Sequence, residues 1–316
     1  MRTADGRPML LAVVGSTATG KSALALSVAT QVGGEIINCD STAVYRGFDI
    51  GTDKVPMSER RGIPHHLIDV AGPTEVYSAA RYSRDASRVV REVTARDRLP
   101  LVVGGTGLYY RALTRGLFPG PGRDPALRAR LSRVARRRGV ETLHRLLGRH
   151  DPDSAHRIQP RDETRLIRAL EVYLLTGRSL TDHFASTRSP IADYVVVTVG
   201  LQLGRDELEA RIVRRVDQQF AGGLLDEIRG LLVAGVPPDV GPFGGLVYRQ
   251  ALEHLRGVRD EAATRALIVR GNRRYARRQL IWFRKEPNLQ WLRVPGERLG
   301  ACQAVRRMLE TARHSS

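Results

Sequence analysis

Residues 15–22, with the sequence GSTATGKS, constrain the fold of this chain more than any other segment. They match the pattern G-x-x-x-x-G-K-[ST], a loop whose backbone N–H groups and lysine surround phosphate oxygens. An apolar run over 9–14 precedes the loop, and helical spacing follows it over 22–32. Because a phosphate loop of this kind lies between a strand and a helix, the sequence predicts a phosphate site here.

The whole loop is expected to contribute to this site, with distinct roles for its last residues. Backbone amides bind the oxygens, Lys21 adds a positive charge, and the Ser22 hydroxyl can reach a magnesium ion. Mg²⁺ is therefore the cofactor that we expect. The predicted diphosphate- or nucleotide-binding residues are Gly15, Ser16, Thr17, Ala18, Thr19, Gly20, Lys21 and Ser22.

Strand and helix patterns alternate along the first part of the chain and predict an α/β fold. We expect strands at 9–14, 34–40, 65–70 and 99–103, an amphipathic helix over 76–98, and another strand near 194–203. This alternation indicates a mostly parallel sheet, whose ligands bind at the carboxyl ends of the strands. The phosphate loop, Asp40 and Thr106 each follow a strand, so we expect them to share one cleft.

The character of the sequence changes at residues 118–125, FPGPGRDP, which carry strong breaker signals. From 125 to 176 only helical periodicity is found, together with many arginines, and strand character returns near Tyr194. We therefore predict a P-loop core in two parts, residues 1–117 and 194–316, with basic helices near the C-terminus. An all-helical insertion over 118–193 interrupts this core and is expected to bind RNA.

The chain is strongly basic, with 51 Lys and Arg against 33 Asp and Glu and a formal net charge of +18. Arginines gather in the predicted insertion and in residues 270–285, RGNRRYARRQLIWFRK. Charge runs often form solvated faces, but two basic elements beside a phosphate site favour a nucleic-acid backbone as partner.

Other features exclude several classes of protein. Only two cysteines occur, so the chain has neither a disulfide framework nor zinc-type spacing. The adjacent His65 and His66 would point to opposite faces of a strand, which argues against a shared metal ion. No window contains the roughly 18 apolar residues of a membrane span. We expect a cytoplasmic monomer that has no contact with a membrane.

The carboxylates that are present or missing near the loop indicate whether it holds a nucleoside triphosphate or a diphosphate. A P-loop ATPase or GTPase normally has an aspartate after a second apolar strand, but here LPLVV is followed by Gly104, Gly105 and Thr106. A glycine pair lets a ligand approach the backbone closely. Asp40 is placed either as a general base or as the cap of the next turn. The loop is thus expected to hold a departing diphosphate.

Longer motifs resemble one family, the tRNA dimethylallyltransferases or tRNA isopentenyltransferases, of the bacterial type. The resemblance rests on GSTATGKS, DSTAVYRGFDIGTDK, RGIPHHLIDV, LVVGGTGLYYRAL, DETRLIRALEVYLLTGRSL and RRYARRQLIWFRK. It implies transfer of a dimethylallyl group from dimethylallyl diphosphate to the exocyclic amine of the adenosine 3′ of the anticodon, which gives N6-isopentenyladenosine. The tRNA anticodon stem-loop would be held between the P-loop core and the helical insertion.

The resemblance also implies roles for single residues. Asp40 would take the proton of the amine, Thr106 would hydrogen-bond near the reacting atoms, and Lys21 would help to neutralise the departing diphosphate. The target adenine would be flipped into the site. Contacts to tRNA are implied for Asp40, Ser41, Thr42, Ala43, Thr106, Arg128, Thr164, Arg165, Leu166, Ile167, Arg168 and Arg249.

The sequence departs from the family pattern at a few positions that bear on RNA recognition, while the chemical residues are kept. The departures are Ser16 for proline, Ala43 for glutamine, Gly244 for a polar or basic residue, Val247 for glycine and Asn272 for threonine. Three other functions stay open: prenyl transfer to a free adenine nucleotide, a small-molecule kinase, and a non-catalytic RNA-binding protein. The arginine-rich elements argue against the first and the missing carboxylate against the second.

Overall fold

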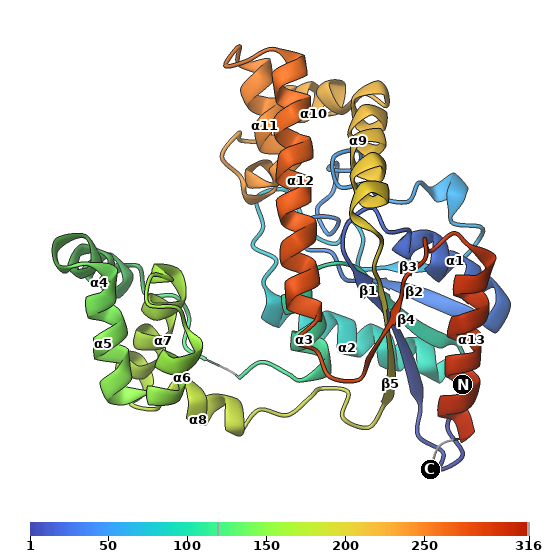
Figure 1. The fold of residues 1–316 in the computed structure, drawn as a ribbon, viewed down its shortest axis with the longest axis horizontal. Coiled ribbons are helices and arrows are strands. Elements are labelled where there is room, and N and C mark those ends of the chain that lie inside the picture. The colour runs from blue at the N-terminus through green and yellow to red at the C-terminus, as the bar shows by residue number, and fades with distance from the viewer. Residues whose placement is uncertain (119, 315–316) are drawn as a thin grey trace. The chain divides into compact units, whose positions relative to one another are not determined.

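The computed structural model describes residues 1–118 and 120–314, which form two compact units. The first unit consists of Met1–Thr114 and Pro190–Ser316, and the second of Arg115–Ser189 (Figure 1). Pro119 of the expected connector and residues 315–316 of the expected C-terminal part lie outside the described residues. The second unit occupies most of the segment for which a helical insertion was expected.

A six-stranded sheet forms the centre of the first unit, in the order β3-β2-β4-β1-β5-β6. All neighbouring strands are parallel, with Leu11 of β1 opposite Leu101 of β4, for example. The α/β fold with a mostly parallel sheet is therefore confirmed. The strands are β1 (Met9–Gly15), β2 (Gly34–Asn38), β3 (His65–His66), β4 (Leu99–Val103), β5 (Val195–Leu201) and β6 (Leu289–Leu292).

Helices cover both faces of this sheet. One face packs against α2 (Ala79–Ala95) and α3 (Gly107–Thr114), and the other against α1 (Lys21–Val32) and α13 (Leu299–His314). Alternate side chains of a strand point to opposite faces, so β1 supplies both cores. Its contributions are Leu10, Ala12 and Val14 to the first core and Met9, Leu11 and Val13 to the second. Burial on both faces explains the uninterrupted apolar run of this strand.

A further group of helices follows the carboxyl end of β5 and lies above the sheet in Figure 1. These helices enclose a third apolar core around Phe48, whose ring meets those of Phe243 and Tyr248 at centroid distances of 5.0 and 4.9 Å. The group comprises α9 (Arg205–Ala221), α10 (Leu224–Val233), α11 (Leu246–Leu255), α12 (Glu261–Phe283) and the short η2 (Gly241–Gly244). Another short turn, η1 (Met57–Glu59), precedes β3.

The helix α12 has one buried side and one charged side. It begins after Asp260, whose carboxylate accepts a hydrogen bond from the Ala263 amide at 2.7 Å. Ile268, Ala276 and Phe283 are buried. The exposed arginines of this helix are Arg270, Arg273, Arg274, Arg277 and Arg278. In the two described stretches of chain, no helix is both long and apolar enough to cross a membrane.

The second unit is helical and has its own apolar core. Leu131, Leu143, Leu147, Leu166 and Leu170 are buried in that core. Its helices are α4 (Pro125–Arg138), α5 (Val140–His150), α6 (Pro152–Arg157), α7 (Glu163–Thr176) and α8 (Leu180–Ala185).

The last residues of the expected insertion, 190–193, belong to the first unit in the structure. Arg91 of α2 holds them, because its Nη2 donates to the carbonyl of Pro190 at 2.8 Å and its Nη1 pairs with Asp193 at 3.0 Å. The strand expected at 65–70 is also shorter than predicted. β3 ends at His66 because Leu67 adopts a left-handed backbone with a φ of 60°, which interrupts strand pairing.

Candidate active site

The phosphate loop connects β1 to α1, and two of its glycines are required by the backbone. Gly15 and Gly20 have φ angles of 133° and 87°, and a side chain at either position would overlap neighbouring backbone atoms. Within the loop, the carbonyl oxygen of Ser16 accepts hydrogen bonds from Thr19 Oγ1 at 2.9 Å and from Lys21 Nζ at 2.7 Å. These bonds hold the lysine against the loop.

A cleft of about 410 Å³ opens beside this loop. Its walls come from the loop, from the chain that follows β2 and β4, and from α9 and α12. Lys21, Ser22 and Asp40 all line it, so the structure brings three predicted site residues together. The cleft lies at the carboxyl edge of the parallel sheet, where α/β proteins bind their ligands.

Lys21 lies in an unusual electrostatic environment. Burial lowers the pKa of its ammonium group to about 8, and the positive charge of Arg215 acts in the same direction. The carboxylates of Asp40 and Asp53 oppose this effect only in part. A ligand with several negative charges would stabilise the buried ammonium, so this environment suits a diphosphate.

Asp40 occupies a turn directly after β2. Its Oδ1 accepts hydrogen bonds from the Thr42 amide at 2.9 Å and from Thr42 Oγ1 at 2.6 Å. The Asn38 side chain braces the same turn through bonds of 3.0 Å to the Asp40 amide and carbonyl. Among residues 1–118 and 120–314, no donor bonds Oδ2 of Asp40. The carboxylate therefore caps the turn with one oxygen and retains the other for a ligand in the cleft.

Thr106 lies next to this turn. Its Oγ1 accepts a hydrogen bond from the Ser41 amide at 3.0 Å, and its own amide donates to the Cys39 carbonyl at 3.1 Å. The side chain of Tyr275, on α12, lies beside Thr106, and burial together with the nearby Asp40 charge raises the pKa of Tyr275 above its usual value. The predicted group of Asp40, Ser41 and Thr106 is thus contiguous.

The glycine pair after β4 is explained by packing of the protein on itself. A side chain on Gly104 would overlap the backbone of Cys39, and one on Gly105 would overlap the amide of Gln279. The sequence suggested that these glycines let a ligand approach the backbone. Gly104 does line the cleft, while protein atoms occupy the space where a side chain at position 104 or 105 would lie.

Arginines of α9 are site residues that the sequence interpretation missed. Arg211 Nε donates to the carbonyl of Ala18 at 2.7 Å, and Arg215 Nη1 donates to Thr17 Oγ1 at 2.6 Å. Together with Arg214 they line the cleft. Their positions in RIVRR, separated by three and four residues, place them on one side of a helix and were the signal available.

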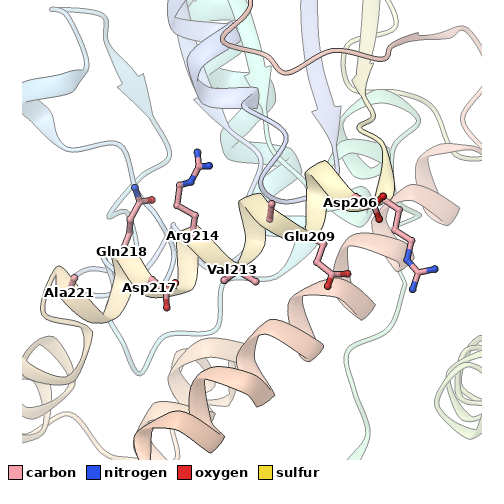
Figure 2. Close-up of a pocket in the computed structure, with 9 residues that line it drawn as sticks. Asp206, Glu209, Val213, Arg214, Asp217, Gln218 and Ala221 are labelled. Atoms are coloured by element: carbon pink, nitrogen blue, oxygen red, sulfur yellow. The ribbon is translucent and has the colours of Figure 1, made fainter.

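A larger hollow of about 930 Å³ follows α9 itself (Figure 2). Figure 2 shows Arg214 and Gln218 on one side of this helix, and these two residues also line the cleft. Glu209 and Asp217 on the hollow pair with arginines of α12, and the Asp217 pair with Arg265 measures 2.9 Å. The carboxylates of Glu209 and Asp217 thus join α9 to α12. The phosphate loop lines the smaller cleft described above, not this hollow.

In the second unit, two predicted tRNA-contacting arginines bind a buried carboxylate instead of projecting freely. Glu171 is fully buried and accepts hydrogen bonds from Arg128 Nε at 2.8 Å and from Arg168 Nη1 at 2.7 Å. It also accepts one from the Asp124 amide at 2.9 Å, and Arg168 Nη2 donates to the Pro121 carbonyl at 3.0 Å. These arginines fasten the start of α4 to α7.

The remaining predicted tRNA contacts differ in exposure. Leu166 and Ile167 are buried in the core of the second unit, so their side chains cannot reach an RNA, whereas Thr164 and Arg165 are exposed. Arg249 is exposed on α11 of the first unit. Of the departures from the family pattern, Ala43 is buried at the cleft, Ser16 is buried in the loop and Val247 packs into the core around Phe48.

The donor set of the cleft fits a magnesium ion that is held mainly by its substrate. Ser22 is exposed at the start of α1, and Mg²⁺ usually takes few protein ligands besides phosphates and waters. Among the described residues, no group of three or more His, Cys, Asp or Glu is arranged to hold a metal. His66 instead pairs with Glu35 at 2.7 Å, and His65 Nδ1 lies 2.8 Å from the Ile63 carbonyl.

Comparisons with known proteins agree on one family. Residues 43–286 match the family described as IPP transferase. A curated tRNA dimethylallyltransferase of Solibacter usitatus is 47% identical over 285 residues, which cover 90% of this chain and 92% of the relative. The corresponding enzyme of Geobacter sulfurreducens is 42% identical, with coverage of 92% and 94%.

Solved structures give the same result. The full-length tRNA isopentenylpyrophosphate transferase of Bacillus halodurans aligns with a TM-score of 0.71 and 36% identity, covering 97% of this chain and 98% of that one. A eukaryotic dimethylallyltransferase acting on tRNA aligns with a TM-score of 0.75 and 25% identity, covering 95% and 78%. The similarity therefore extends over both units of the chain.

Proposed function

Because the chain belongs to the IPP transferase family, we propose that it transfers a dimethylallyl group from dimethylallyl diphosphate to a tRNA. The acceptor is the exocyclic amine of the adenosine 3′ of the anticodon, and the product is N6-isopentenyladenosine. One observation carries this proposal: a single cleft holds both the phosphate loop with Lys21 and the carboxylate of Asp40.

The adenine amine is a poor nucleophile, because its lone pair is delocalised into the ring. In the proposed reaction the amine nitrogen bonds the allylic carbon, the bond from that carbon to the diphosphate oxygen breaks, and the amine proton moves to Asp40. The Oδ2 atom of Asp40 is the oxygen with unused acceptor capacity. The Thr106 hydroxyl, held by Ser41, hydrogen-bonds beside the reacting atoms.

Charge stabilisation of the leaving diphosphate comes from basic groups that line the same cleft as Asp40. Lys21, Arg214 and the loop amides supply positive charge where negative charge develops. Ser22 would hold a magnesium ion, which would supply additional charge neutralisation. The positions of these groups support a donor whose diphosphate departs, because no carboxylate follows β4 as in a nucleotide hydrolase.

RNA binding is proposed for exposed basic residues in both units. In the second unit Thr164 and Arg165 are the exposed members of the predicted tract, and in the first unit Arg249 and the arginines of α12 are exposed. The names of the relatives and the net charge of +18 support a tRNA partner. With bacterial relatives and a tRNA substrate, we propose that the chain acts in the cytoplasm.

The test is prenyl transfer to an anticodon stem-loop RNA by purified protein with dimethylallyl diphosphate and magnesium. Asp40→Ala is expected to abolish turnover and to leave RNA binding intact. Asp226→Ala, at a carboxylate that is 79% exposed on α10, is the matched control and should keep full activity. Turnover by Asp40→Ala at most of the wild-type rate would refute the proposed base, and a preference for AMP over the RNA would indicate a free-nucleotide enzyme.

A further inference from the structure

The buried side of α12 reaches the phosphate loop through the side chain of Gln279. Its Oε1 accepts a hydrogen bond from the Thr17 amide at 2.8 Å, and its Nε2 donates to the Gly105 carbonyl at 2.9 Å. One amide thus joins the loop after β1 to the loop after β4. Gln279 is only 5% exposed, so water cannot readily replace either bond.

The geometry around this amide is specific. A side chain at position 105 would overlap the Nε2 of Gln279, which explains why glycine stands there. Thr17 is fixed from two directions, by Gln279 through its amide and by Arg215 through its hydroxyl. The Thr17 N–H is therefore occupied within the protein, and the shape of the loop is set before a phosphate arrives.

The same helix also carries the charged side described above. Tyr275 lies one turn before Gln279 on α12, lines the same cleft and lies beside Thr106. Arg274, Arg277 and Arg278 are exposed on the same helix, and the guanidinium of Arg278 lies 5.6 Å from the centroid of the Tyr275 ring. A shift of α12 would therefore move a tether of the phosphate loop and a contact of Thr106 together.

We propose that Gln279 is a positioning residue, which holds the diphosphate loop in its binding shape and links that loop to α12. The part of this inference that concerns RNA rests on the proposed function, because it takes the exposed arginines of α12 as RNA contacts. RNA bound to α12 then changes the affinity of the cleft for diphosphate through Gln279. The effect on the loop alone does not depend on RNA.

The first test measures binding of inorganic pyrophosphate with magnesium by calorimetry. Gln279→Leu keeps the bulk of the side chain but leaves the Thr17 amide and the Gly105 carbonyl unpaired, so affinity is expected to fall roughly tenfold or more. Gln250→Leu is the matched control, since Gln250 is also buried but bonds Arg259 away from the cleft, and it should bind pyrophosphate like wild type. If Gln279→Leu does not fold, Gly105→Ala perturbs the same contact from the other side.

The second test repeats the titration with saturating anticodon stem-loop RNA. The ratio of pyrophosphate affinities with and without RNA should differ from one in the wild type and approach one in Gln279→Leu. A merely structural role would weaken both affinities and leave the ratio unchanged, which would overturn the link. Wild-type affinity for pyrophosphate in both Gln279→Leu and Gly105→Ala would overturn the positioning role. Absence of prenyl transfer by the wild type would instead refute the proposed function and leave the pyrophosphate result in force.

Discussion

Glu171 of the second unit provides a prediction whose size follows from the structure. Burial alone would raise the pKa of its carboxyl group, but hydrogen bonds from Arg128, Arg168 and the Asp124 amide lower it to about 2. Gln in its place keeps the shape but removes the charge that both guanidinium groups share. A buried carboxylate with two arginine partners is then replaced by two cations that compete for one neutral oxygen.

The cost can be estimated in two ways. A pKa of about 2 in place of the usual 4.5 corresponds to about 3 kcal/mol of stabilisation at neutral pH. Breaking a buried ion pair by removing one partner typically costs about 3–5 kcal/mol. Both values lead us to expect that Glu171→Gln destabilises the second unit by about 3 kcal/mol.

The assay is urea unfolding of the full chain at pH 7, with hydrogen exchange of the α4 and α7 amides to assign the loss to the second unit. Because the folded pKa of Glu171 is depressed, its contribution is present above about pH 4.5 and is lost as the pH falls toward 2. Glu171→Gln should lack this acid-dependent loss. In the control Glu141→Gln, the partner Arg161 is 88% exposed, so the unfolding free energy is expected to change little. A Glu171→Gln variant as stable as that control would refute the reasoning.

Three further predictions concern the site and the RNA surface. Pyrophosphate affinity should decline as the pH rises through about 8, where Lys21 loses its charge in the free protein; calorimetry on Lys21→Met should show a weaker and flatter dependence. Asp40→Asn should lower kcat by roughly 10²–10⁴-fold, measured with saturating RNA and donor, with little change in RNA affinity. Arg165→Ala should weaken RNA binding in a filter assay without loss of stability, whereas Arg168→Ala should chiefly lower the free energy of unfolding. If both variants weakened RNA binding equally and neither lost stability, these different roles would be contradicted.

The sheet and the phosphate loop could be predicted because their signals are local. The apolar run of β1, the loop glycines and the start of α1 are contiguous in sequence, and strand order then brings Asp40 to the same edge. Thr106 lies at this edge for the same reason, because it follows β4. Once the sheet is known to be parallel, these residues meet whatever the details of their side chains.

The supporting contacts could not be predicted in this way, because they join distant segments. Gln279 meets Thr17 across 262 residues, and Arg215 meets it across 198. Nothing in the surrounding sequence distinguishes Gln279 from an exposed glutamine. Similarly, the family resemblance implied an RNA contact for Arg168, and only the fold reveals that Glu171 is buried beside it.

Modification of the adenosine amine itself tests the central claim most directly. Two anticodon stem-loops would be compared by nucleoside mass spectrometry after incubation with the protein, dimethylallyl diphosphate and magnesium. One carries adenosine 3′ of the anticodon, and the other carries inosine, which lacks the exocyclic amine. The account predicts isopentenyladenosine in the first RNA and no product in the second. An unmodified first RNA, or equal modification of both, would contradict it.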